Sequence, residues 1–566
     1  MKYRFFRDNQ LRTAVAFFAL LSLFSCHRKR APREREIVKD VRQLSEVVPE
    51  HITEYLEFIA DNENIMEDSV RAQDPAALTY FYQQTGNGAV WSSNGVLNPA
   101  ADSMFFFIDH ADESGLRPAD YHAAALKTAL GLIKGDSEDG EAARKDASLW
   151  ARVDVMMTDA FMKMASHLRF GVAPKDSITL RKDSIFTDTL LSDMLRTALM
   201  QDNPGAAIGE ALGELEPTYE GYRQLKAQLR PFKAKYAAMH WDSLPLSYTD
   251  TPAFRQQLIN RLVQTGHLDT AGGHSTDTAL LKPGIRLFQR EFNMYDDGLA
   301  GKKTIQALNR SYTDWLAQVA VNLDRWRKLP DSLPDRYIFV NIPAYRMELW
   351  DSGQVVLESR VIVGAPRTRT PLLNSRMTNF VMYPYWRVPF SIAVKEMLPA
   401  IRKDREYLVK KNLEVIGKSG EAVHPDSINW DKLSKNYFPY VLRQMDGVEN
   451  SLGIMKFNFM NKYSVYLHDT NSRGLFKNAY RALSHGCVRV QQWDSLAMYL
   501  IKDDSRHSRD SVRAWLARGE KKQIDIQRSI PIYLRYFTAE GRNDKLVFHE
   551  DIYGEDKVLK KLMGWK

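Results

Sequence analysis

The residues best suited to chemistry in this 566-residue chain lie toward its C-terminal end, where His468 precedes Cys487 by 19 residues. A thiol attacks a carbonyl carbon well only as the thiolate, and free cysteine ionises at a pKa near ~8.5. An imidazole within hydrogen-bonding reach is therefore the expected activator of a nucleophilic cysteine. The pair predicts acyl transfer, with Cys487 as the nucleophile and His468 as the general base.

The neighbours of these two residues fit the same chemistry. Gly486 lets the backbone approach a substrate closely, and the N–H groups around Cys487 are suited to hold the oxyanion that forms during acyl transfer. The second ring nitrogen of His468 needs a fixed partner, which we expect to be a carbonyl or the carboxylate at Asp469. The segment with the cysteine reads Ser484-His485-Gly486-Cys487-Val488-Arg489.

Two other interpretations use the same residues. A zinc site would draw on His468, His485 and Cys487, but zinc sites normally use paired ligands at fixed intervals, and Asp469 would be needed as a fourth. A papain-like peptidase places its nucleophile before its base in the chain, whereas here the base comes first. Phosphate-binding and dinucleotide-binding glycine motifs are missing from the sequence. We therefore expect no metal and no cofactor.

The N-terminus predicts export. Residues 1–26 contain basic residues, a largely apolar run over residues 14–24 and then Ser25-Cys26, which is the pattern of a signal peptide. An uncleaved membrane anchor is the alternative, although a membrane span needs about 20 apolar residues. Residues 23–26 also resemble a bacterial lipobox, in which the cysteine is lipidated and becomes the first mature residue. We therefore expect a lipid anchor at Cys26.

The cysteine count supports a chemical role for Cys487. The chain has two cysteines, and Cys26 is either lipidated or removed with the signal. An exported protein enters an oxidising compartment, where structural cysteines normally pair, so a solitary thiol there is a candidate for chemistry. A small buried apolar residue is the alternative role.

The net charge of +8 belongs mostly to the N-terminus. Residues 1–40 carry ten Lys and Arg against four Asp and Glu, which leaves only +2 for the rest of the chain. A folded basic surface is therefore not predicted, and we expect no nucleic-acid partner.

Helices dominate the first half of the chain. Residues 27–45 are polar and charged and predict a tether, whereas residues 46–248 predict a helical scaffold domain without a catalytic constellation. Apolar residues recur three and four apart over residues 151–168 and 219–239. This region is expected to support the active site rather than to form it.

A small helical domain is predicted over residues 249–314. Its motif resembles that of the helical peptidoglycan-binding domain, in which two glycines permit tight turns and a threonine caps the last helix. An ordinary three-helix module without glycan contact is the alternative. The residues that carry the motif are Phe288, Gln289, Gly298, Gly301 and Thr304.

Residues 315–566 predict the domain that must position Cys487 and His468. After a helix at 315–329, β-branched and aromatic residues predict strands at 337–342, 346–350 and 355–363, with a hairpin turn at 351–353. Further strands are expected at 379–383, 464–467 and 531–537. Between residues 390 and 453 the pattern turns helical, which indicates an inserted helical capping subdomain. The expected fold class is therefore α+β and multidomain.

The motif residues resemble one known family, the YkuD-type L,D-transpeptidases. That family carries a histidine, then Ser-His-Gly-Cys with an arginine two residues beyond the cysteine, as His468, Cys487 and Arg489 do here. The order of helical region, peptidoglycan-binding unit and β-rich domain with a cap is similar to the large multidomain YcbB-like branch. Further matches lie at residues 341–344, 363–364, 450–453 and 456–457, so the resemblance spans most of residues 50–555.

The resemblance implies a reaction on peptidoglycan in the periplasm of a Gram-negative-type envelope. Cys487 would attack the carbonyl at the third residue of a tetrapeptide stem and expel D-alanine, and an amine would then accept the acyl group. His485, Arg489 and Ser484 are implied to position the substrate or to shape the site. The alternatives are an L,D-carboxypeptidase, which uses water as the acceptor, and a peptidoglycan-binding scaffold without activity.

Overall fold

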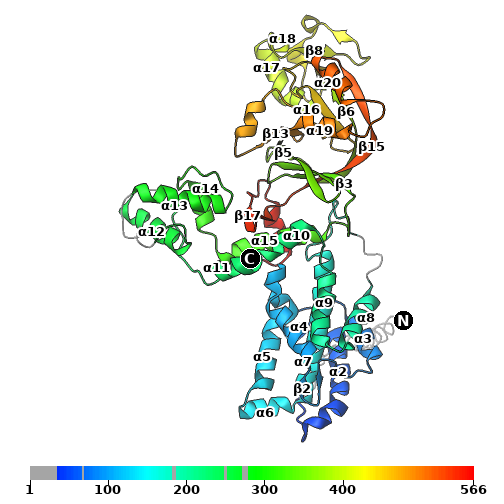
Figure 1. Ribbon diagram of the computed structural model, residues 1–566, viewed down its shortest axis with the longest axis vertical. Helices are drawn as coiled ribbons and strands as arrows, with labels where there is room; N and C mark the ends of the chain where they lie inside the picture. The colour runs from blue at the N-terminus through cyan, green and yellow to red at the C-terminus, as the bar shows by residue number, and fades with distance from the viewer. Residues whose placement is uncertain (1–34, 67–68, 182–186, 248–250, 270–277, 566) are drawn as a thin grey trace, which may run out of the picture. The chain divides into compact units, whose positions relative to one another are not determined.

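The computed structural model describes residues 35–66, 69–181, 187–247, 251–269 and 278–565, which form two compact units (Figure 1). One unit is helical and ends at residue 216, and the other contains residues 217–565 with two short earlier segments, 113–115 and 170–181. The signal segment, Cys26 and most of the tether lie outside the described residues. Within the described ranges, no helix combines the length and the apolar character that a membrane crossing requires.

The helical unit begins several of its helices where the sequence places a polar residue before proline. Asp74, Asn98 and Asn203 are N-caps whose side chains accept backbone N–H bonds, and proline occupies the first helical position after each of them. The elements of this unit are α2 (Leu44–Asp61), α3 (Pro75–Gln84), β1 (Ser92–Ser93), β2 (Val96–Leu97), α4 (Pro99–Asp109), α5 (Ala123–Lys134), α6 (Glu138–Arg144), α7 (Ala147–Phe170), α8 (Asp188–Leu199) and α9 (Pro204–Glu214).

α7 is the core helix of this unit, because most of its side chains are buried. Its Asp154 accepts hydrogen bonds from the hydroxyl of Tyr82 and from the N–H groups of Val90 and Trp91. Burial raises the pKa of Asp154 to about 6, while these hydrogen bonds lower it. The carboxyl group thus fastens α3 and the following loop to α7, which is a structural role.

The structure moves two predicted boundaries. The described end of the predicted tether is folded: Val38 is buried, Asp40 and Gln43 form a capping box, and α2 begins at Leu44. The helical unit ends at residue 216 rather than 248, because α10 (Glu220–Ala227) and α11 (Leu229–Tyr236) bury their apolar residues in the core of the second unit. Helical periodicity alone does not show which core a helix joins.

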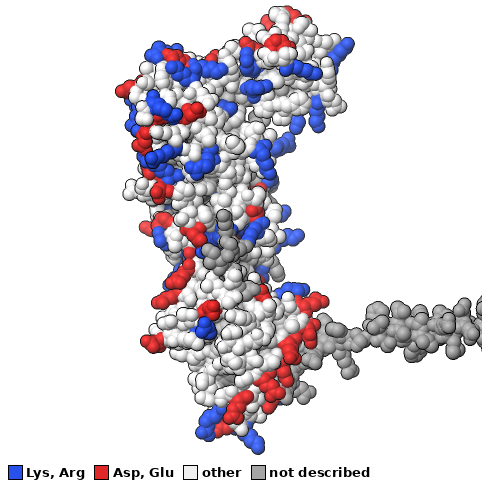
Figure 2. Space-filling view, turned by 90° about the vertical axis from the view of Figure 1, so that its right-hand side faces the viewer, with Lys and Arg blue, Asp and Glu red and all other residues white. Residues whose placement is uncertain are grey.

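The surface of the helical unit carries an acidic stripe. Exposed carboxylates follow one face of α2 at Glu46, Glu50, Glu57 and Asp61. Figure 2 shows acidic side chains gathered on one part of the face that it draws, whereas basic and acidic side chains are interspersed elsewhere. This part of the surface is therefore acidic, although the chain as a whole has a net positive charge.

The centre of the second unit is a mixed β-sheet that closes on itself. Its order is β13-β5-β14-β12-β11-β6-β15-β3-β4, and β4 pairs again with β5. The strands are β3 (Arg336–Asn341), β4 (Arg346–Asp351), β5 (Gln354–Gly364), β6 (Leu373–Met382), β11 (Met455–Phe459), β12 (Leu467–His468), β13 (Ala482–Ser484), β14 (Val488–Val490) and β15 (Lys522–Arg535).

Apolar side chains fill the interior of this barrel. They include Ile338, Met347, Phe380 and Leu534, all fully buried, and α19 (Trp493–Leu500) and α20 (Arg509–Ala517) pack against the same core. The predicted hairpin turn after β4 is confirmed: Asp351 pairs with Gln354, and Ser352 and the following glycine have positive φ. The α+β fold class is confirmed as well.

The sequence predicted a helical insert, and this prediction is only partly right. The insert also contains a four-stranded sheet of order β7-β10-β8-β9. Its strands are short and interrupted by polar residues, which hid them in the sequence. A core that includes Ile401 and Trp430 belongs to the insert itself. Its elements are β7 (Trp386–Arg387), α16 (Phe390–Ile392), a π-helical turn (Ala393–Met397), α17 (Leu398–Lys403), α18 (Tyr407–Lys410), β8 (Leu413–Ile416), β9 (Ala422–Val423) and β10 (Val441–Gln444). We call this insert the cap; Figure 1 shows α17, α18 and β8 grouped together.

The small helical domain shares its core with the end of the chain. Phe288 and Phe292 pack in one cluster with Trp315 and Phe548. The predicted boundary near residue 314 therefore does not separate two cores. The elements involved are α12 (Pro252–Gln264), α13 (Thr278–Glu291), α14 (Lys302–Leu308), α15 (Tyr312–Arg327), β16 (Ala539–Arg542), β17 (Lys545–Phe548) and α21 (Glu555–Leu562).

Candidate active site

Strand pairing in the barrel brings the predicted reactive residues to one face. β12 runs parallel to β14 and places His468 opposite Arg489. Cys487 directly precedes β14, and the N–H of Val488 donates to the carbonyl oxygen of Tyr466 over 3.1 Å. Cys487 therefore lies beside Tyr466 and diagonal to His468. Because side chains alternate along a strand, these four side chains lie on one face of the sheet.

Two basic residues flank His468. The antiparallel pairing of β11 with β12 places Lys456 opposite His468, while Arg489 lies on the other side. The three residues form a row across three adjacent strands. The ammonium group of Lys456 also lies 4.3 Å from the centre of the Tyr466 ring. The sheet thus surrounds the imidazole with positive charge.

The thiol of Cys487 is held by the strand before His468. Its Sγ lies 3.9 Å from the carbonyl oxygen of Ser464, whose backbone has a positive φ of 55°. The backbone and the hydroxyl of Tyr466 lie next to the sulfur, and the side chain of Trp386 lies next to that hydroxyl. Burial raises the pKa of Cys487, while Tyr466 and the two basic neighbours lower it.

His468 is buried and neutral. Burial, followed by the positive charge of Arg489, lowers the pKa of His468 to about 3, and backbone groups of Asp469 and Leu452 oppose this shift. Its Nδ1 is buried and has no hydrogen-bond partner among the described residues. A neutral imidazole can accept a proton, so the residue suits a general base better than one half of a permanent thiolate–imidazolium pair.

The Asp469 carboxylate does not hold His468. It accepts hydrogen bonds from Arg473, at 3.1 and 2.7 Å, and from the N–H of Ile454 at 3.1 Å. Of the two partners predicted for His468, the backbone at Asp469 is the one that affects its pKa. Asp469 instead fixes the turn that leads into β11.

Ser484 and Gly486 shape the turn around the cysteine. The hydroxyl of Ser484 donates to the carbonyl oxygen of Cys487 over 2.6 Å and accepts from the N–H of Gly486 over 3.1 Å. Gly486 has a φ of 119°, and its carbonyl oxygen accepts from the hydroxyl of Thr370. Among the hydrogen bonds of the described residues none uses the N–H of Cys487. That N–H is therefore available to an oxyanion.

His485 connects this turn to the cap. Its Nε2 lies 2.8 Å from Oε1 of Glu396, which belongs to the π-helical turn. Both side chains stay about half exposed, at 47% and 53%. The residue before Gly486 is therefore at the surface, in contrast to the buried His468.

The residues of the predicted peptidoglycan-binding motif build the small helical domain. Phe288, Gln289 and Thr304 are buried, and Gln289 donates to the hydroxyl of Thr304 and accepts from the N–H of Gly298. Gly298 has the expected positive φ, whereas Gly301 does not. Thr304 does not cap the helix as predicted, because α14 begins one turn earlier, with Gly301 as its N-cap. Phe288, Gln289 and Thr304 therefore have structural roles in this domain, and glycan binding stays a prediction.

Four residues around the site were missed in the sequence. Tyr466 stands two positions before His468, so strand alternation would have placed it on the same face. Lys456 was noted only as a family match, because no strand was predicted there. Trp386 and Glu396 come from the cap, and no local pattern predicts their approach to Tyr466 and His485.

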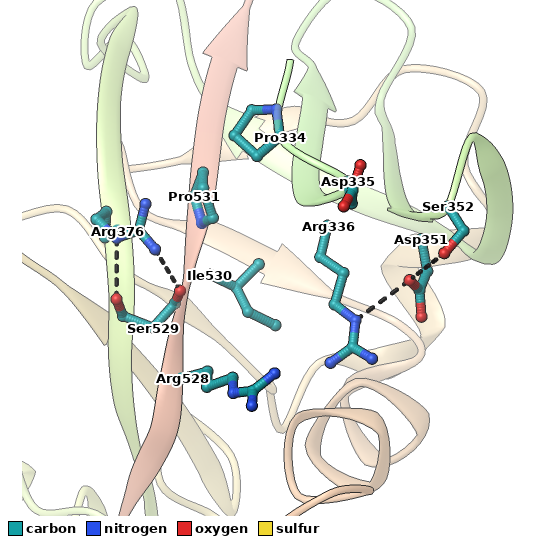
Figure 3. A pocket seen from close by; sticks show the side chains of 10 residues that line it. All are labelled: Pro334, Asp335, Arg336, Asp351, Ser352, Arg376, Arg528, Ser529, Ile530 and Pro531. Atoms are coloured by element: carbon teal, nitrogen blue, oxygen red, sulfur yellow. Dashed lines mark hydrogen bonds and ion pairs between the residues drawn. The ribbon is translucent and has the colours of Figure 1, made fainter.

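A hollow lies elsewhere in the barrel. It has a volume of about 420 Å³ and is lined by residues of β3, β4, β6 and β15 and of the loops before β3 and after β4 (Figure 3). Its Arg336 pairs with Asp351, and its Arg376 donates to Ser529. We assign no chemistry to it, since neither Cys nor His lines it. In the described parts of the chain, no three His, Cys, Asp or Glu side chains converge on a possible metal position.

Comparisons with known proteins agree with this geometry. Residues 335–502 match the family model of the L,D-transpeptidase catalytic domain, named YkuD, and residues 76–229 match that of a scaffold domain. A Haemophilus influenzae protein with the name "Putative L,D-transpeptidase" is 38% identical over 242 residues, which is 43% of this chain and 48% of the relative. The chain thus matches about half the length of that relative. Residues 335–502, which match the model of the L,D-transpeptidase catalytic domain, contain both Cys487 and His468.

Proposed function

We propose that this protein is a peptidoglycan L,D-transpeptidase with Cys487 as the nucleophile and His468 as the general base. The observation that carries the proposal is the single sheet face on which Cys487, His468, Tyr466 and two basic residues meet, within the residues that match the family model. His468 is neutral before the reaction and takes the thiol proton in the proposed step, and Lys456 and Arg489 stabilise the thiolate, since both lower the pKa of the thiol.

The acylation step follows from this arrangement. The thiolate attacks the carbonyl carbon at the third residue of a tetrapeptide stem, and the free N–H of Cys487 holds the oxyanion. The intermediate then collapses: the bond to D-alanine breaks, the leaving nitrogen takes the proton from His468, and a thioester remains on Sγ. Attack by an amine on this thioester forms a new amide and restores the thiol.

Acylation can be measured directly. Purified protein that lacks residues 1–26 should react with a carbapenem, because the thiol opens its strained β-lactam amide and forms a thioester. The intact mass of the protein should then rise by the mass of one carbapenem molecule. Cys487→Ala should show no increase. A folded wild-type protein that forms no adduct would contradict the proposal and favour a peptidoglycan-binding scaffold.

The acceptor decides between two related enzymes. With tetrapeptide muropeptides as the substrate, a transpeptidase yields cross-linked dimers or amine adducts. An L,D-carboxypeptidase yields tripeptides, because water accepts the acyl group. Mass spectrometry of the products separates these outcomes, and we expect dimers.

We also propose that the protein acts in the periplasm, held at a membrane by lipid on Cys26. The support is the basic, apolar and Ser25-Cys26 pattern of the N-terminus. The mass of the N-terminal peptide should show the lipid, and Cys26→Ala should move the protein from the membrane fraction to the soluble fraction. An N-terminal peptide without lipid would contradict the anchor but not the enzymatic proposal.

A further inference from the structure

His485 and Glu396 form a further pair near Cys487 that the reaction above leaves unused. Nε2 of His485 lies 2.8 Å from Oε1 of Glu396. His485 is two residues before the nucleophile, and Glu396 is supplied by the cap. A carboxylate and an imidazole are therefore held together within reach of the nucleophilic segment.

Stability does not explain this pair. Ion pairs that stay about half exposed to water contribute little to folding, and the cap has an apolar core of its own. Glu396 also lies in a π-helical turn, a rare conformation that occurs often at functional sites. These features favour a group that meets a ligand.

Charge indicates which ligand fits. Lys456 and Arg489 surround Cys487 and the buried His468 with positive charge, which suits carboxylates and the oxyanion but repels a cation. The acyl acceptor of a transpeptidase is an amine, which is an ammonium ion near neutral pH. It needs an anionic contact and must lose a proton before it can attack. Glu396 supplies negative charge beside a titratable imidazole.

We propose that Glu396 binds the ammonium group of the acyl acceptor and that His485 takes its proton. This inference rests on the proposed transpeptidase function. The ammonium ion gives one proton to the imidazole of His485, and Glu396 stabilises the imidazolium. The freed lone pair forms the amide bond with the thioester carbon while the C–S bond breaks. The second nitrogen proton passes through His468 to the thiolate, and His485 returns its proton to water.

The test compares two acceptors on the same acyl-enzyme. A second tetrapeptide presents an ammonium ion, whereas hydroxylamine is largely neutral near pH 7 and needs neither the anionic contact nor the first proton transfer. Glu396→Gln should lower dimer formation, relative to carbapenem acylation, by about tenfold, which corresponds to the loss of one charged hydrogen bond. Hydroxamate formation should fall far less, and Glu396→Asp should restore part of the dimer yield.

A matched control lies in the same cap. Glu406 is exposed and pairs with Lys410 away from His485, so Glu406→Gln should leave both products unchanged. Equal losses of acylation, dimer and hydroxamate in Glu396→Gln would mean a structural role and would overturn the inference. An unchanged dimer yield would overturn it too. If the wild type forms no adduct at all, the proposed function fails instead, and the two failures are distinguishable.

Discussion

Tyr466 lies beside the nucleophile. Burial raises the pKa of the Cys487 thiol, and the side chain of Tyr466 lowers it. Tyr466→Phe removes the hydroxyl and should raise that pKa. A hydrogen bond to a charged group contributes about 1.5–3 kcal/mol, so carbapenem acylation near neutral pH should slow by about 10- to 150-fold.

The measurement is the acylation rate as a function of pH. The rate of Tyr466→Phe should recover at higher pH, because the thiolate then forms without the hydroxyl. Tyr463 is exposed in the same segment, and Tyr463→Phe is the control that should behave as the wild type. A profile of Tyr466→Phe that is lowered equally at every pH would contradict the role of the hydroxyl in thiol ionisation.

His468 should make the protein sensitive to acid. Its pKa is about 3 in the folded chain and near 6.5 when unfolded, so between these values the unfolded chain binds a proton that the folded chain does not. The free energy of unfolding should therefore fall as the pH falls below 6.5, by about 2 kcal/mol at pH 5 relative to neutral pH. Urea unfolding at pH 7 and at pH 5 gives the free energy of unfolding of the wild type and of His468→Gln. The difference in this free energy between the two proteins should be smaller at pH 5 than at pH 7.

A histidine NMR titration tests the same statement without a variant. The His468 ring signal should not move between pH 7.5 and 5, because the pKa of the buried ring is lowered to about 3. A shift of the His468 signal near pH 6.5 would show that the ring is accessible and would contradict a buried neutral base.

The two reactive residues were predictable because their chemistry lies in local sequence. Cys487 stands inside a six-residue motif, and His468 lies only 19 residues earlier. Glu396 and Trp386 were not predictable, since they meet His485 and Tyr466 only after the cap folds back onto the barrel. Solvent exposure was also hidden, because the sequence gives no sign that His485 is exposed and His468 buried.

Among the elements, the junction of the cap and the barrel depends on Asn450. The side-chain amide donates to the carbonyl oxygen of Pro384, just before β7, and to that of Met445, just after β10. It therefore ties the chain that enters the cap to the chain that leaves it. Asn450→Ala leaves these carbonyl groups without partners, which should cost about 1–3 kcal/mol.

Hydrogen exchange locates this effect. In Asn450→Ala, amides of β7, β8 and β10 should exchange faster than in the wild type, while those of β6 and β15 should change less. Asn471 is exposed and donates to a nearby carbonyl, so Asn471→Ala serves as the control with little change. Equal acceleration in the cap and in the barrel would mean that Asn450 supports the whole fold rather than this junction.

Sequence patterns predicted single helices and strands better than they predicted which of these elements pack or pair together. The hairpin between β4 and β5 and the long helix α7 followed from turn residues and apolar spacing. The strands of the cap did not, because β9 has only two residues and β8 and β10 have four. Short strands gain their stability from pairing with distant partners, and a local pattern does not contain that information.

For the whole molecule, the end of the chain returns to a helix that precedes the barrel. Gln318 and Asn322 of α15 hydrogen-bond to Thr538, which follows β15. Asp556 of α21 completes the arrangement, since it accepts from the hydroxyl of Thr538 over 2.6 Å and pairs with Arg325 over 2.7 Å. The end of the chain and α15, far apart in sequence, thus meet around one buried carboxylate.

Asp556→Asn tests how much the stability of this unit depends on the contacts of Asp556 with Thr538 and Arg325. Both partners are largely buried, and removal of the charge leaves the guanidinium of Arg325 unpaired, which should cost about 3–5 kcal/mol. The neighbouring Glu555 pairs with Arg369 at the surface, so Glu555→Gln should cost about 0–1 kcal/mol. Urea unfolding measures both, and hydrogen exchange should show α21 opening first in Asp556→Asn. If the two variants lose equal stability, the buried carboxylate does not hold the chain end in place.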